Sequence, residues 1–176
     1  MASIRMILGL SNLIEEGTMK FTLQLLAFCV LTTSIFSCSQ PKSNFVARDV
    51  RTARISLTRT NCYGKCPVYK VTVYGTGNVE FEGFANTKVL GKQSTQIPVD
   101  SVRTLVAEIE KNQYYALKDN YEEYQMTDLP TVFTEVEIDG VLKKIKHYQG
   151  DRTTPQQLSD LEIRIDEIAT TPQWLE

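Results

Sequence analysis

Two cysteines and the chain's only histidine are the side chains best suited to chemistry: Cys62, Cys66 and His147. Three residues separate the cysteines. In an oxidising compartment such a close pair forms a disulfide. Gly64 allows a positive φ inside the small ring, and Pro67 fixes φ where the next strand begins. We therefore expect a disulfide-braced turn between two strands.

The same three side chains allow a second interpretation, a thiol-redox or Cu(I) site. Two thiolates and one imidazole suit a soft Cu(I) ion. The C-x-x-x-C-P stretch with a distant histidine is similar to the copper-binding motif of membrane-anchored assembly proteins with a thioredoxin fold, and this resemblance implies Cys62, Cys66 and His147 as ligands. Those proteins continue into a helix, whereas residues 68–74 have the pattern of a strand. We expect no metal site and no cofactor, and keep the copper or redox site as the alternative.

Further candidate residues lie in or near these motifs. Asp128 precedes Leu129-Pro130-Thr131. An aspartate there usually accepts backbone N–H bonds at the start of a strand, although a buried carboxyl with a raised pKa can act as a general acid or base. A histidine on the core side of a strand end is more often a hydrogen-bonded packing residue than a ligand. The candidate functional surface comprises Tyr63, Gly64, Pro67, Tyr69, Asp128 and His147.

Composition and motifs exclude several functional classes. The net charge is −2, so the chain lacks the clustered Lys and Arg that nucleic-acid binding requires. The sequence has no nucleophile elbow, phosphate loop, dinucleotide fingerprint or H-E-x-x-H motif. With one histidine and no recognisable catalytic pairing, we expect a domain that is not an enzyme and does not bind nucleic acid.

The segment Met19–Cys38 resembles the signal peptide of a bacterial lipoprotein. Lys20 provides the positive start, residues 21–36 an apolar run, and Ser37 a small residue before a cysteine. The run is too short for a comfortable membrane span of about 20 apolar residues, so we expect it to be cleaved. In such peptides the cysteine after the cleavage point is lipid-modified and becomes the new N-terminus, and the resemblance implies this role for Cys38.

This interpretation sets the domain boundaries and the location. We expect residues 1–18 to be an upstream extension, 19–37 the signal peptide, 38–52 a polar tether and 53–176 a single α+β domain. Ser39, not Asp, follows Cys38. By resemblance to other lipoproteins this favours the outer membrane, with the domain facing the periplasm. The expected partners are the membrane, through the lipid, and a protein or envelope polymer.

Periodicity predicts strands and helices in a definite order. Alternating apolar residues predict a strand that begins at Arg54 and includes Ile55 and Leu57, further strands at 68–74 and 79–82, and more weakly one at 87–97. An apolar stripe predicts a helix from Pro98 to Lys111. We expect the segment 113–130, which holds Tyr114, Tyr115, Tyr121 and Tyr124, to be an ordered loop whose rings pack over the sheet. The alternative is that these rings line a peptide or glycan surface.

Two elements complete the chain. Asp139-Gly140 is a hairpin turn between strands 131–138 and 141–147, and it places Ile138 opposite Val141 and His147 opposite Val132. Thr154-Pro155-Gln156-Gln157 predicts a capping box before a helix of residues 155–168. The order β-β-β-(β)-α-β-β-α predicts an α+β fold, an antiparallel sheet of about five to six strands with two helices on one face.

The motif Cys62-Tyr-Gly-Lys-Cys-Pro-Val-Tyr69 also carries a family resemblance. Together with Asp128–Thr131, residues 147–150 and the last helix, it resembles an uncharacterised domain family of bacterial lipoproteins with a C-[YF]-G-x-C-P-x-Y motif. The similarity covers most of residues 53–175. The family has no assigned activity, so the resemblance implies a domain and a lipoprotein context but no mechanism.

Overall fold

The computed structural model describes residues 48–123 and 127–175, which all belong to one compact unit. The predicted upstream extension, the signal peptide, Cys38 and the tether up to residue 47 lie outside the described residues, as does Tyr124. No helix in the described part of the chain is long and apolar enough to cross a membrane.

The described residues form an α+β fold built on one mixed sheet of seven strands. The spatial order is β4-β3-β2-β1-β6-β7-β5. The strands are β1 (Arg54–Arg59), β2 (Val68–Tyr74), β3 (Asn78–Ala85), β4 (Gly91–Gln96), β5 (Asn120–Tyr121), β6 (Thr131–Ile138) and β7 (Val141–Tyr148). Three short 3-10 helices, η2 (Val50–Thr52), η3 (Tyr114–Ala116) and η4 (Thr171–Trp174), lie outside the sheet strands.

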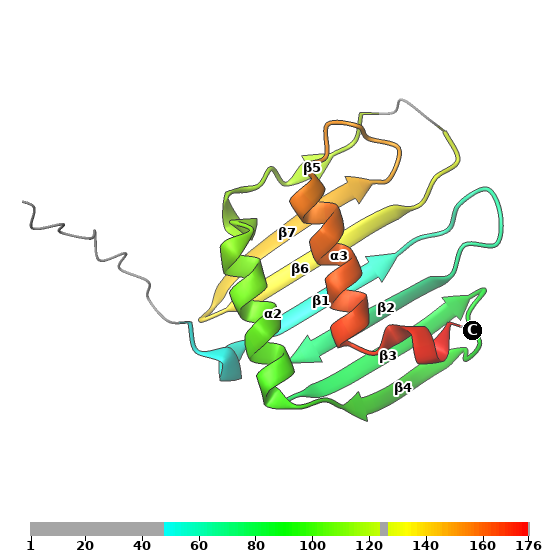
Figure 1. Ribbon diagram of the computed structural model, residues 1–176. Coiled ribbons are helices and arrows are strands. Elements are labelled where there is room, and N and C mark those ends of the chain that lie inside the picture. The colour runs from blue at the N-terminus through cyan, green and yellow to red at the C-terminus, as the bar shows by residue number, and fades with distance from the viewer. Residues whose placement is uncertain (1–47, 124–126, 176) are drawn as a thin grey trace, which may run out of the picture. The chain divides into compact units, whose positions relative to one another are not determined.

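Two helices, α2 (Val99–Lys111) and α3 (Gln156–Ile168), lie side by side on one face of the sheet (Figure 1). Their apolar stripes face the strands, because residues three and four apart share one side of a helix. The core between the two layers includes the buried residues Ile55, Leu57, Val71, Phe81, Leu105, Ile109, Val136, Leu158, Leu161 and Ile165. The predicted α+β fold with two helices on one face is confirmed.

The sheet differs from the prediction in strand number and in one pairing. Seven strands are present instead of five or six, and β5 pairs with β7 in parallel, with Tyr121 next to His147. The prediction missed β5 because two residues are too few to show a period inside the polar segment 113–130. Burial of Tyr114 and Tyr121 in the core explains why residues 114–121 are held against the sheet.

The hairpin of β6 and β7 has the predicted register. Ile138 pairs with Val141, and Val132 pairs with His147. On the opposite face, Lys144 donates a hydrogen bond of 2.9 Å to Glu135. The register places His147 on the helix-covered face, where it meets α3.

The capping box predicted before α3 is wrong. Pro155 occupies the N-cap position with extended backbone, and α3 begins one residue later, at Gln156. The side chain of Thr154 therefore caps nothing, and its Oγ1 is buried without a hydrogen-bond partner among the described residues.

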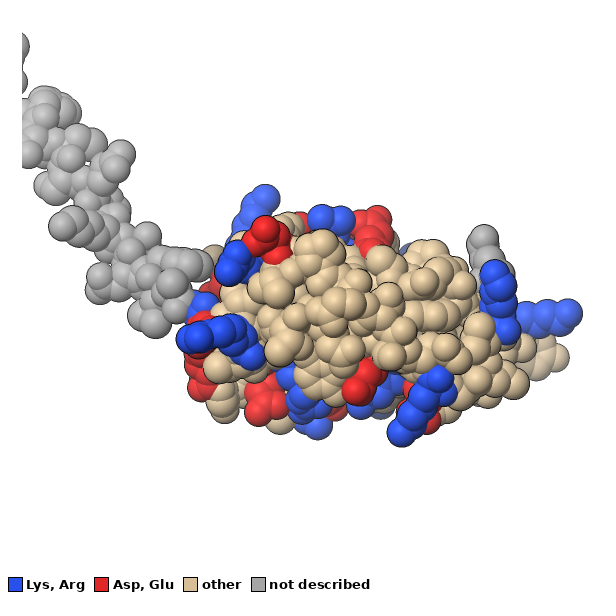
Figure 2. Space-filling model, turned by 90° about the horizontal axis from the view of Figure 1, so that it is seen from below, with Lys and Arg blue, Asp and Glu red and all other residues tan. Residues whose placement is uncertain are grey.

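The other face of the sheet is polar, and β4 forms one edge. Ser56 and Thr72 join across this face at 3.1 Å between their hydroxyl oxygens. Figure 2 views the β4 side and shows a broad area with few charged side chains, most of which gather along its margins. Lys92 is the one charged residue of β4. The buried His147 and Glu162 lie on the helix-covered face instead.

Candidate functional site

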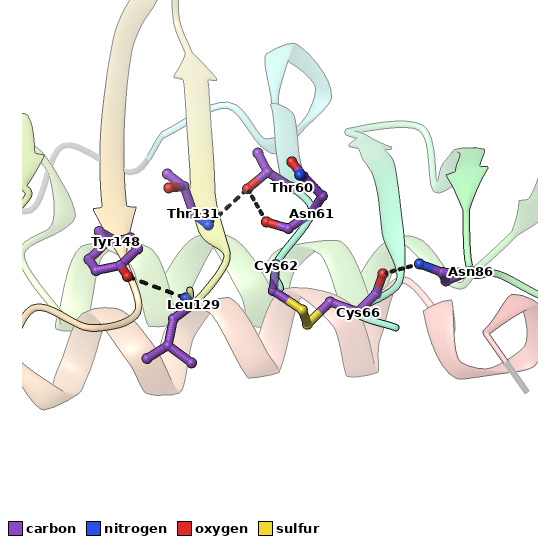
Figure 3. The surroundings of a disulfide bond; sticks show 8 residues. All are labelled: Thr60, Asn61, Cys62, Cys66, Asn86, Leu129, Thr131 and Tyr148. Carbon is purple, nitrogen blue, oxygen red and sulfur yellow. Dashed lines mark hydrogen bonds between the residues drawn. A yellow bond between two sulfur atoms is a disulfide. The ribbon is translucent and has the colours of Figure 1, made fainter. Parts of the chain in front are cut away.

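A disulfide between Cys62 and Cys66 closes the loop that joins β1 to β2 (Figure 3). The two Cα atoms are 5.8 Å apart. Asn86 donates a side-chain hydrogen bond of 3.0 Å to the Cys66 carbonyl and so ties the loop to the segment after β3. The disulfide shapes a short loop, and the bond from Asn86 holds this loop to the segment that follows β3.

The same loop is fastened to the segment before β6. The Tyr63 amide donates to the Asp128 carbonyl at 3.0 Å. The Thr131 amide donates to Thr60 Oγ1 at 2.9 Å, and the Leu129 amide donates to the Tyr148 hydroxyl at 3.2 Å (Figure 3). These bonds join loops that are far apart in sequence into one surface at this end of the sheet.

Asp128 and Gly64 act differently from what their residue types suggested. Asp128 has a positive φ of 72°, a conformation that an aspartate tolerates better than most residues. Its carboxylate accepts a hydrogen bond of 3.0 Å from Thr127, and its backbone carbonyl holds Tyr63. Gly64 does not have a positive φ, so that expectation is wrong; a Cβ there would meet only Cys62 Sγ, at 3.7 Å.

Tyr63 and Tyr69 of the cysteine motif have opposite surroundings. The Tyr63 side chain is 88% exposed at the tip of the loop, whereas Tyr69 is 1% exposed in the core. Pro67 is half-buried between them, directly before β2. The predicted functional surface therefore splits into an exposed part around Tyr63 and a buried part that includes Tyr69 and His147.

The buried part begins as one row of side chains across the sheet. Tyr69 pairs with Arg59, Arg59 pairs with Val132 on the other side, and Val132 pairs with His147. Directly opposite residues point to the same face, so all four side chains face α3. Three of the four carry polar groups and need partners from the helix.

Two carboxylates of α3 provide those partners. Asp166 Oδ1 accepts from the Tyr69 hydroxyl at 2.8 Å, and Asp166 Oδ2 accepts from Arg59 Nη2 at 2.8 Å. Both carboxylate oxygens of Glu162 lie 3.0 Å from His147 Nδ1. Since Glu162 and Asp166 are four residues apart, they share one side of α3. We call these five residues, Arg59, Tyr69, His147, Glu162 and Asp166, the polar row.

Burial and charge set the protonation of the polar row. Burial raises the pKa of the Glu162 carboxyl above its ordinary value, and the hydrogen bond to His147 opposes this only in part. Burial raises the pKa of the Tyr69 hydroxyl, and Asp166 adds to the effect. Burial disfavours the charge of Arg59, but Asp166 and Tyr69 outweigh it and raise its pKa. Arg59 and Asp166 therefore form an ion pair within the row.

A pocket of about 510 Å³ opens at the His147 end of the polar row. Arg59, His147 and Glu162 contribute to its lining, together with Leu129, Gln149, Asp151, Arg152, Thr154, Gln156, Ser159 and Ile163. Burial would raise the pKa of Asp151, but hydrogen bonds from Thr153 and the Glu123 amide lower it, so this carboxylate is charged and satisfied. The pocket combines hydrogen-bond donors and acceptors at a site where ionisable groups are buried.

The structure does not arrange Cys62, Cys66 and His147 as a metal centre. Both sulfur atoms are in the disulfide, and Glu162 occupies Nδ1 of the imidazole. Among residues 48–123 and 127–175, no group of three His, Cys, Asp or Glu side chains is placed to hold a metal ion. The copper or redox alternative remains a prediction for the reduced protein.

Arg59, Glu162 and Asp166 were not among the candidate residues expected from the sequence. Arg59 continues the alternation of Ile55 and Leu57, and this pattern predicts an inward-facing, half-buried arginine. Glu162 and Asp166 offered no comparable signal, since acidic residues beside an apolar stripe are normally in solvent. Only the three-dimensional structure shows that Glu162 and Asp166 contact the histidine, arginine and tyrosine of the polar row.

Comparison with known proteins gives a family but no activity. A family described as a domain of unknown function, DUF6438, matches residues 53–169. No curated protein matches the chain. The match includes the disulfide loop and every member of the polar row. Because it covers about two thirds of the chain, this protein belongs to the family of domains of unknown function named DUF6438.

Proposed function

We propose that this protein is a lipid-anchored component of the cell envelope whose domain binds a protein or an envelope polymer and is not an enzyme. The anchor is the lipid on Cys38, and the location is the periplasmic side of the outer membrane. The support for export comes from two independent features, the signal-peptide pattern of residues 19–37 and the Cys62–Cys66 disulfide. Disulfides persist in the periplasm and are rare in the cytosol.

The binding surface is the disulfide loop, and the exposure of Tyr63 is the observation that carries this assignment. Its side chain is 88% exposed, while the backbone beneath it is held by the disulfide and by the Asp128 carbonyl. Tyrosine is enriched at the energetic centres of interfaces because it offers a large contact area with few rotatable bonds. A braced loop loses little further entropy on binding, so contact energy is not spent on ordering it.

Binding is tested by capture from envelope extracts of the native host. Tyr63→Ala should reduce capture of a specific partner at least tenfold, as truncation of an interface anchor does. Phe133→Ala is the matched control, because Phe133 is also an exposed aromatic residue but lies on the open face of the sheet. Equal capture by the wild type and Tyr63→Ala would contradict the proposed surface.

The anchor has a separate test. Cys38→Ser should abolish acyl labelling and leave an unprocessed precursor or a soluble product, whereas Cys29→Ser should be labelled normally. Continued labelling and membrane retention of Cys38→Ser would refute the lipid anchor. The alternative function is examined in the reduced protein, where one Cu(I) bound per molecule and lost in His147→Ala would replace the binding role by metal handling.

A further inference from the structure

The pocket beside the polar row is a second site, distinct from the exposed loop around Tyr63. We propose that it binds a neutral, polyhydroxylated ligand, a sugar unit, through the free ring nitrogen of His147. The proposal stands independently of the function proposed above, because it uses none of the contacts assigned to Tyr63.

Stability alone does not explain a buried histidine and glutamate. His147 is 5% exposed and Glu162 is 2% exposed. A well-packed apolar pair at such a place is often as stable as a buried ionisable pair, or more so. Perturbed ionisable groups beside a cavity are candidates for a functional site. The His147–Glu162 pair therefore indicates that the pocket it lines binds a ligand.

The geometry of His147 leaves one nitrogen for a ligand. Both oxygens of Glu162 engage Nδ1 at 3.0 Å, and no partner for Nε2 is present among the described residues. With Glu162 ionised and the imidazole neutral, Nδ1 donates and Nε2 accepts. With the imidazole protonated, or with Glu162 protonated and donating to Nδ1, Nε2 donates to a ligand. A hydroxyl group both donates and accepts, so it fits His147 in either state.

The charges of the pocket favour a neutral ligand over an ion. The carboxylate of Asp151 is satisfied by Thr153 and the Glu123 amide, and that of Glu162 by His147. The charge of Arg59 is held by Asp166. An anion would meet the carboxylates of Asp151 and Glu162, and a cation would meet the guanidinium groups of Arg59 and Arg152.

The remaining lining suits the alternating polar and C–H surfaces of a sugar. Gln149, Gln156 and Ser159 supply side-chain donors and acceptors, and Thr154 Oγ1 is buried without a described partner. Leu129 and Ile163 supply apolar contacts. The volume of about 510 Å³ lies within the range of roughly 300–1,000 Å³ found for small-molecule sites.

The single histidine makes the site directly observable. In the purified protein, the imidazole NMR signals belong to His147 alone. They are followed during titration with glucose, galactose, N-acetylglucosamine and maltose, and separately with acetate and inorganic phosphate. We expect a saturable shift with at least one sugar. Absence of a shift with every sugar, or a saturable shift with acetate or phosphate alone, would overturn the proposal.

Two serine variants locate the binding. Ser159→Ala should weaken the affinity for the sugar roughly threefold to tenfold, the loss expected for one hydrogen bond. Ser94→Ala, an exposed serine on β4, should leave the affinity unchanged. If both variants bind the sugar as the wild type does, or if both lose the same affinity, the pocket is not the site. Thermal unfolding of both variants verifies that they fold.

Discussion

Replacing Tyr69 by phenylalanine isolates the contribution of one buried hydroxyl to stability. The hydroxyl donates to Asp166 Oδ1 at 2.8 Å and accepts from Arg59 Nε at 2.9 Å. The aromatic ring keeps its stack on Phe81, with ring centroids 5.5 Å apart, so little apolar contact is lost. The variant therefore reports on the hydrogen bonds rather than on packing.

The expected cost follows from the charge of the two partners. A hydrogen bond to a charged group contributes about 1.5–3 kcal/mol, and an unsatisfied buried acceptor costs about as much. Asp166 Oδ2 keeps its two bonds from Arg59, at 3.1 and 2.8 Å, so the ion pair survives and only Oδ1 loses its donor. We expect Tyr69→Phe to lower the free energy of unfolding by about 2–3 kcal/mol.

Urea unfolding followed by tryptophan fluorescence measures this loss. Trp174, the chain's only tryptophan, stacks on Phe81 with ring centroids 4.8 Å apart and so reports on the core beside Tyr69. The midpoint should fall by roughly 1 M at an unchanged slope, given a slope of about 1–3 kcal/mol per molar urea. Tyr74→Phe is the control, since its hydroxyl bonds Glu80 at 2.9 Å on the exposed face. If both variants change stability by less than about 0.5 kcal/mol, the reasoning is refuted, because water then replaces the buried bonds at no cost.

Three further variants test other parts of the structure. Leu161→Ala should lower the free energy of unfolding by about 2–5 kcal/mol in the same assay, whereas Ile163→Ala, 55% exposed, should change it by less than about 0.5 kcal/mol. Cys62→Ser/Cys66→Ser should fold and lose roughly 2 kcal/mol, because the closed loop is short; a protein that fails to fold would show that the bridge is essential. Since burial raises the pKa of Glu162, its contribution to stability is fully present below about pH 4.3 and is lost as the pH rises through the folded-state pKa. As the pH rises through that range, the free energy of unfolding of the wild type should fall relative to that of Glu162→Gln. A difference between the two that stays constant with pH would contradict a raised pKa of Glu162.

The sequence predicted most of the fold because the long elements have clear periods. The hairpin register from Ile138 and Val141 follows from a two-residue turn and strict alternation, and both are local properties. The helix stripes are equally local. β5 could not be predicted, because its two residues are ordered by the burial of Tyr121 and by pairing with β7, which lies further along the chain.

The candidate site was less predictable, because its chemistry depends on contacts between distant segments. Cys62 and Cys66 were found because their partners are each other. His147 was recognised as a core-side residue, but its partner Glu162 lies on the helix that follows β7, and nothing in its local sequence marks it as buried. A carboxylate that is buried by tertiary packing has the same local sequence as one that is exposed, so its role is visible only in three dimensions.

The polar row also contacts the elements that carry both proposed sites. Arg59 is the last residue of β1 and leads into the disulfide loop, while Tyr69 follows that loop at the start of β2. Asp166 holds both of these side chains, so it fixes the two ends of the loop against α3. Glu162, one turn earlier on α3, holds His147 at the pocket. A shift of α3 on ligand binding at His147 would therefore change the support beneath the loop, whereas a rigid α3 would keep the two sites independent.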